Sequence, residues 1–154
     1  MISVQVEGVG GIIANLQKAI RAETEKMNKR LSAAGDVANA HIHNQASLTD
    51  HTLQQLKEMG HPYSVRYQTN YGPHHDDTLV HRQSGLLYDN IQKVEDLGDT
   101  TSTVQIGVSA DTVPYIDDLI HGNETMRPRN FLGKGFELSK EDVQGTLDGT
   151  DQTI

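Results

Sequence analysis

The sequence predicts an α+β fold, in which several helices accompany one antiparallel β-hairpin. A helical apolar period extends from Ile12 to about His43, and alternation of apolar and polar residues indicates a strand from Thr101 to Val108. With 154 residues, the chain has the length of one domain with its own core. We expect residues 1–145 to form this domain and residues 146–154 to form a flexible C-terminal tail.

The N-terminal third is expected to contain a short strand followed by the longest helix. Ile2, Val4 and Val6 alternate with polar residues, which is the period of a half-buried strand. The helix would be about 45 Å long at 1.5 Å per residue. Because this exceeds what so small a domain needs, we expect part of it to pack on a neighbouring subunit. Gly35 predicts a kink or a close approach of another element. The apolar stripe of the helix consists of Ile13, Leu16, Ile20, Met27, Leu31, Ala34, Ala38 and Ile42.

A helix and a loop are predicted as an insertion at about residues 47–82. The helix covers residues 47–60, with Thr49 or Asp50 as its cap and a glycine at its end. From Tyr63 to Arg82 no period is sustained, and loops beyond ~15 residues in compact domains are usually functional or disordered. We therefore expect an arm or loop that becomes ordered on a partner.

The C-terminal half is expected to hold the hairpin and two more helices. The hairpin pairs Ser84–Val94, whose residues can also form a short helical turn, with Thr101–Val108. Pro114 occupies a favoured first helical position, and Gly122 ends the short helix that follows. A last helix is predicted near residues 130–145. The residues of the first strand that are expected to face the core are Leu87, Ile91 and Val94.

Composition narrows the classes of function. The net charge of -8 argues against a nucleic-acid clamp, which needs a basic face. The absence of cysteine excludes disulfides, thiolate zinc sites and cysteine catalysis. The N-terminus lacks the pattern of a secretory signal, and no run approaches the ~18 apolar residues of a membrane span. We expect a soluble, cytosolic protein with no membrane partner.

Few residues offer metal-binding or catalytic chemistry. His74, His75, Asp76 and Asp77 form the sharpest cluster, because imidazole and carboxylate groups are ligands for zinc or iron. Adjacent residues seldom point toward one ion, so the pattern favours a solvated loop. We therefore assign no catalytic residue, metal or cofactor and expect no enzymatic activity. The alternatives are a metal-dependent hydrolase that uses this cluster and a monomeric adaptor protein.

A small basic group surrounds an aromatic residue before the last helix. Arg127, Arg129 and Lys134 lie around Phe131 in a chain that is acidic as a whole. We interpret these three cations as partners in salt bridges between subunits. Phe131 and Leu132 are expected to anchor the loop by burial, which is worth about 1.5–3 kcal/mol for one such side chain.

The order of these features resembles the tail-completion (neck) proteins of long-tailed bacteriophages. That family has a Thr-Gly-x-Leu-x-x-Ser-Ile element, a hairpin, a Tyr-Ala-x-x-x-Glu-aromatic-Gly-Thr element and a Pro-Phe-Leu segment that opens the last helix. Where the family has Glu and the aromatic residue, this chain has Ile120 and His121, and two residues separate Pro128 from Phe131. The residues that carry the resemblance are Gly85, Leu86, Asn90, Ile91, Tyr115, Gly122, Pro128, Phe131 and Leu132.

The resemblance implies a virion structural protein with a small antiparallel β-sheet packed by one long N-terminal helix and shorter helices. Such proteins resemble hexameric rings between a head-side connector or stopper protein and the tail tube or tail terminator protein. DNA would pass through the lumen without sequence-specific binding, and an acidic lining would repel it. The chain would assemble in the host cytoplasm and reside in the virion neck. Its structural and interface residues would be Gly85, Leu86, Tyr115, Gly122, Arg127, Pro128, Phe131 and Leu132.

Overall fold

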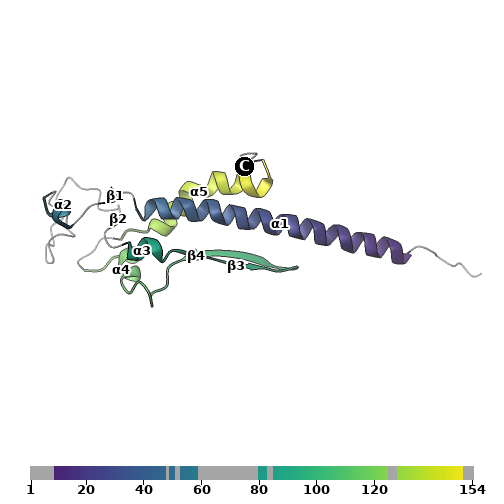
Figure 1. Cartoon of the computed structure of the whole chain (residues 1–154), viewed down its shortest axis with the longest axis horizontal. Helices are drawn as coiled ribbons and strands as arrows, with labels where there is room; N and C mark the ends of the chain where they lie inside the picture. The colour runs from purple at the N-terminus through teal and green to yellow at the C-terminus, as the bar shows by residue number, and fades with distance from the viewer. Residues whose placement is uncertain are drawn as a thin grey trace, which may run out of the picture.

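A computed structural model of the chain describes residues 9–47, 49–50, 53–58, 80–82, 85–124 and 128–150. It contains a long N-terminal helix, shorter helices and a two-stranded antiparallel sheet, which confirms the predicted α+β class (Figure 1). In chain order the elements are α1 (Val9–Gln45), β1 (Thr49–Asp50), α2 (Leu53–Glu58), β2 (His81–Arg82), α3 (Leu86–Asp89), β3 (Gln92–Leu97), β4 (Ser102–Gly107), α4 (Ile116–His121) and α5 (Phe131–Asp148).

Helix α1 is the longest element, and α5 and the β3–β4 hairpin flank only part of it (Figure 1). It spans 37 residues, or about 55 Å at 1.5 Å per residue, and extends slightly beyond the predicted range at both ends. Apolar residues at steps of three and four share one face of the helix. In the C-terminal half of α1 that face is covered, so Ala34, Ala38 and Ile42 are buried. In the N-terminal half it is not, and the large apolar side chains there are exposed.

Strands β3 and β4 form the predicted antiparallel hairpin. Gln92 lies opposite Gly107, and the amide of Gly98 donates a hydrogen bond to the carbonyl of Thr101 at 3.1 Å to close the turn. The hairpin therefore forms by local pairing across a short connection, as its alternating sequence predicts.

The hairpin begins later than Ser84, because the preceding residues adopt the alternative helical turn, α3. Gly85 precedes α3 with a φ of 82°, a left-handed conformation that favours glycine. The prediction that Val94 faces the core is wrong, since its side chain is 58% exposed. Lys93 is directed toward α1, where it bonds Asp36, and successive strand residues point to opposite faces.

Two glycines allow other elements to approach α1 closely. A Cβ atom at Gly35 of α1 would lie 2.6 Å from Cγ1 of Val104 in β4. A Cβ atom at Gly135 of α5 would lie 2.7 Å from the Cα atom of Ile42. The close approach predicted at Gly35 is confirmed, and α1 continues through it as a helix.

The core lies where α1 ends and α3, α4 and the start of α5 meet. Phe131, the first residue of α5, is 3% exposed, and Leu132 packs against the same cluster while partly buried. The expected anchoring of this segment by Phe131 is therefore confirmed. Leu87 and Ile91 face the core as predicted. The buried members of the cluster are Ile42, Ala46, Val80, Leu87, Ile91, Val113, Ile116, Leu119 and Phe131.

The predicted helix over residues 47–60 is shorter in the structure. β1 pairs in parallel with β2, so that Thr49 lies opposite His81, and α2 covers only Leu53–Glu58. Thr49 and Asp50 belong to a strand and are not helix caps. Residues 59–79, which include the loop predicted after Tyr63, and the strand predicted within residues 1–8 lie outside the described residues.

Helices α4 and α5 are close to their predicted positions. α4 begins at Ile116, two residues after Pro114, and ends at Gly122, whose φ is 77°. α5 is capped by Asn130, whose side-chain oxygen accepts a hydrogen bond from the amide of Gly133 at 2.8 Å. α5 continues to Asp148, so residues 146–148 of the expected tail are helical, whereas residues 151–154 lie outside the described part. No helix in the described part of the chain is long and apolar enough to span a membrane.

Candidate interaction surface

Within the described ranges, no three or more His, Asp or Glu side chains come together in a way that could hold a metal ion. The cluster singled out in the sequence, His74 to Asp77, lies outside those ranges. The described residues form two apolar surfaces along helix α1.

The residues that carry the phage-neck resemblance lie at one end of the core. Gly85 is buried, while Leu86, which follows it at the start of α3, is 41% exposed. Tyr115 precedes α4 and is 39% exposed, and partial burial raises the pKa of its hydroxyl. Gly122 ends the same helix. Helices α3 and α4, which hold or adjoin these residues, lie at the same end of the molecule (Figure 1) and contribute buried side chains to one cluster.

One member of the basic group around Phe131, Arg129, does not lie at the surface as interpreted from the sequence. Arg129 is 2% exposed, and its amide donates a hydrogen bond to the carbonyl of Leu119 at 2.6 Å. The interpretation of Arg129 as a partner in salt bridges between subunits is therefore wrong, because its side chain is buried within its own chain. Arg127 lies outside the described residues, whereas Pro128 and Lys134 are exposed.

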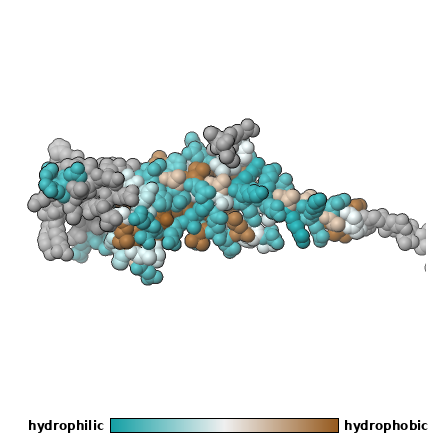
Figure 2. Space-filling view, viewed as in Figure 1, coloured by the Kyte–Doolittle hydropathy of each residue, from teal (hydrophilic) through white to brown (hydrophobic). Residues whose placement is uncertain are grey.

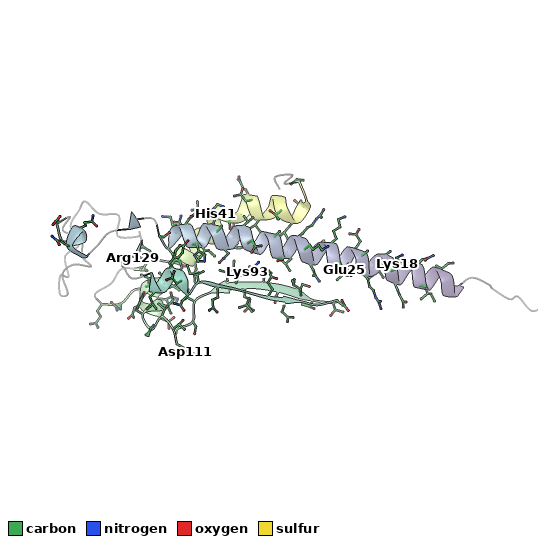
Figure 3. All side chains as sticks on the ribbon, in the orientation of Figure 1. Lys18, Glu25, His41, Lys93, Asp111 and Arg129 are labelled. Atoms are coloured by element: carbon green, nitrogen blue, oxygen red, sulfur yellow. The ribbon has the colours of Figure 1, made fainter. Side chains whose placement is uncertain are left out.

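The N-terminal part of α1 is exposed on all sides. We call residues 10–22 the arm; every one of them is exposed, and Lys18 lies beyond the ends of α5 and of the hairpin (Figure 3). Successive steps of three and four residues place Ile13, Leu16 and Ile20 on one face of the arm. The exposed fractions of these large apolar side chains are 50%, 59% and 56%, and that of Ile12 is 68%. Brown surface at the projecting end of α1 makes this visible (Figure 2).

An open apolar groove continues from the arm along α1. It consists of two adjoining hollows of about 630 and 350 Å³, which share Leu31 and Leu147 in their linings. One wall is the hairpin, with Val104 of β4, and the other is α5, with Phe136. We call this feature the groove. Its apolar lining residues are Ala19, Ile20, Met27, Leu31, Ala34, Ala38, Ile42, Val104, Ile106, Leu132, Phe136, Val143 and Leu147.

Hydrogen bonds fix the hairpin wall to α1. The ammonium group of Lys93 bonds Asp36 of α1 and lies 2.6 Å from Oε1 of Glu95, which also accepts a hydrogen bond from Ser32 of α1 at 2.7 Å. Hydrogen bonds to Asp36 and Glu95 raise the pKa of Lys93, and those from Lys93 and Ser32 lower the pKa of Glu95. Near the turn, Asn28 donates to the carbonyl of Gly98 at 3.2 Å. The groove therefore has a wall that is held in place by several polar contacts.

Charge is distributed unevenly between the arm and the rest of the chain. The arm contains Lys18 and Arg21 and no acidic residue. The segment 85–124, which includes the hairpin, contains one lysine and eight carboxylates, for a net charge of -7. These carboxylates are Asp89, Glu95, Asp96, Asp99, Asp111, Asp117, Asp118 and Glu124.

The sequence predicted the arm stripe but not the groove. The signal for the α5 wall was present, because Leu132, Phe136, Val143 and Leu147 follow one another at steps of four, seven and four residues. The spacing of residues in α5 does not predict that β4 lies opposite this helix across the groove. The prediction that part of α1 packs on a neighbouring subunit stays a prediction.

His43 joins α1 to α3 through its ring. The imidazole lies edge-on to the ring of Tyr88, with centroids 4.5 Å apart. Burial lowers the pKa of His43 below its ordinary value, and the carboxylate of Asp89 opposes that effect. The folded chain therefore binds a proton at this position less readily than the unfolded chain does.

This histidine gives stability a pH dependence of predictable sign. Below the ordinary histidine pKa of about 6.5, the unfolded state binds more protons, so stability falls as pH decreases. We expect the midpoint temperature of thermal unfolding to decrease as the pH is lowered from about 7.5 to about 5.5. The decrease should be smaller in His43→Phe, which keeps an aromatic ring but cannot titrate. Equal decreases in both proteins would contradict this role of His43.

No family model, curated protein sequence or solved structure matches the chain.

Proposed function

We propose that this chain is a structural subunit of the neck of a long-tailed bacteriophage, which forms a ring between the DNA-filled head and the tail. The observation that carries the proposal is the arm, which presents a continuous apolar face that nothing in the described part of its own chain covers. An extended apolar face of this kind is typical of a surface that binds another protein.

The size of the arm stripe suits stable association. Full burial of a large apolar side chain contributes about 1.5–3 kcal/mol, and the arm exposes Ile12, Ile13, Leu16 and Ile20 by half or more. Association costs an estimated 4–15 kcal/mol in lost translational and rotational freedom. Burial of these four side chains is thus of the magnitude that offsets the cost, with contributions from the rest of the interface.

The order of the elements supports the phage neck over other assemblies. The Gly85–Leu86 element, the hairpin, the Tyr115 helix that ends at Gly122 and the Phe131 helix occur in the order that the tail-completion proteins have. A head-side connector or stopper and a tail tube or terminator protein would then be the partners. The acidic segment 85–124 would suit a passage through which DNA moves without adhering, since like charges repel.

Particles made without this chain provide the test. In the phage or prophage that encodes it, we expect disruption of its gene to yield DNA-filled heads and finished tails that remain unjoined in electron micrographs. Purified chain added to that lysate should join them and restore infectivity. A matched addition of Ile13→Asp/Leu16→Asp protein tests whether joining needs the arm. Normal joined particles in the disrupted strain would contradict the proposed function.

A further inference from the structure

We infer that the arm of one copy lies in the groove of the next copy. The inference rests on the proposed ring and names the two surfaces that would meet in it. Both are apolar, both lie on every copy, and the two differ in shape, since the arm is a convex ridge and the groove is an open hollow between α5 and the hairpin.

The arm needs a covering partner in order to be a stable helix. Short isolated helices are marginal in water, and helices in proteins gain most of their stability from packing of an apolar face. This one also begins with Gly10 and Gly11 and has no acidic residue in its first turn, so neither propensity nor the helix dipole supports its N-terminal end. Its apolar stripe is therefore the feature whose burial would hold the arm in helical form.

A copy cannot place its own arm in its own groove. Arm and groove floor belong to the same uninterrupted helix, α1, and the arm continues away from α5 and the hairpin (Figure 1). The occupant of the groove must therefore come from another molecule. In the space-filling view, hydrophobic surface also appears beside the hairpin, apart from the projecting end of α1 (Figure 2).

Charge favours the arm of a second copy as that occupant. The arm carries Lys18 and Arg21 without an acidic residue, and Glu23 of α1 and Asp99 of the hairpin turn line the larger hollow of the groove. Both carboxylates are exposed at this margin. Opposite charges at the margin of an apolar contact favour encounter and correct register. Pairing of two arms with each other would instead bring like charges together, and the acidic margin would repel DNA.

A contact of this kind joins two different surfaces and leaves one of each unused at the ends of any chain of copies. Such heterologous contacts close into a ring when the rotation between neighbours permits, and otherwise extend as a filament. Each copy would donate one arm and receive one.

The first test compares two double variants of the arm in the full chain. Ile13→Asp/Leu16→Asp places two charges in the stripe, and Ala14→Asp/Gln17→Asp places the same two charges outside it, where the side chains are also exposed. By sedimentation velocity across a concentration series, we expect the wild type to form an oligomer. The stripe variant should weaken association at least about tenfold, and the control should not. Circular dichroism melts should show the same core unfolding in all three.

The second test mixes two variants that each lack one surface. Phe136→Asp alters the groove at an exposed side chain and leaves the arm intact, whereas Ile13→Asp/Leu16→Asp leaves the groove intact, because neither residue lines it. Each should be monomeric alone, and the mixture should form a complex of one copy of each that grows no further. A mixture that stays monomeric would overturn the pairing of arm with groove.

The outcomes separate this inference from the proposed function. A wild-type ring that survives both the stripe and the groove variants would overturn the arm-in-groove contact and leave the neck assignment standing. A wild-type chain that stays monomeric at all concentrations, and whose loss leaves particles joined, would contradict both.

Discussion

Replacement of Phe131 by alanine is expected to lower the free energy of unfolding by about 3–5 kcal/mol, the usual cost of removing a buried aromatic side chain. Phe131 is 3% exposed and packs in the cluster that joins α1, α3, α4 and α5. Because a domain of this kind has a total stability of only about 5–15 kcal/mol, the loss would be a large fraction of that total. Chemical denaturation followed by circular dichroism measures it.

The chain supplies its own control, since it contains a second phenylalanine. Phe136 lies five residues further along α5 and is 51% exposed. Phe136→Ala removes the same atoms from the groove wall, and we expect it to cost less than about 1 kcal/mol, as surface substitutions usually do. Similar losses in the two variants would show that Phe131 does not anchor the core.

Substitution of Gly135 by alanine is expected to destabilise the packing of α5 on α1. The added Cβ atom would lie 2.7 Å from Cα and 3.0 Å from the backbone nitrogen of Ile42, and backbone atoms cannot rotate away as a side chain could. Overpacking of this kind costs about 1–3 kcal/mol. The helix must therefore shift, and the midpoint of denaturant unfolding should move to lower concentration.

Gly145→Ala in the same helix provides the matched comparison. There the nearest atom to an added Cβ is the hydroxyl oxygen of Thr150, at 3.7 Å, an ordinary contact. Alanine is favoured over glycine within a helix by about 1 kcal/mol, so this substitution should stabilise the chain. Opposite signs for the two changes are the expected result, and stabilisation by both would exclude a close contact at Gly135.

The spacing of apolar residues predicted the helices and strands that are long enough to show a regular period. Apolar residues at steps of three and four predicted α1, and alternation of apolar and polar residues predicted β4. The close approach of another element at Gly35 was predicted from the presence of a glycine within a helical pattern. The short parallel pair of β1 and β2 could not be predicted in this way, because Thr49 and His81 are far apart in the sequence. Two-residue strands carry no period.

One part of the candidate surface could be predicted from the sequence and another could not. The arm stripe is a property of one helix, so spacing alone predicts it. The groove depends on α5 and β4 lying on either side of α1, and the burial of Arg129 depends on where Leu119 places its carbonyl. Because arginine is rarely buried, Arg129 is expected at the surface. Its burial results from tertiary packing, which the local sequence does not predict.

The uninterrupted course of α1 through Gly35 links the arm to the core by helical phase. Each residue of a helix turns the chain by about 100° and advances it by 1.5 Å. The direction in which Ile13, Leu16 and Ile20 face, relative to α5 and the hairpin, is therefore set by the number of residues between them and the core. One residue more or fewer in this interval would rotate the stripe by about 100° relative to the core and leave the packing of the core unchanged. The number of residues in this part of α1 therefore determines how neighbouring copies would be oriented.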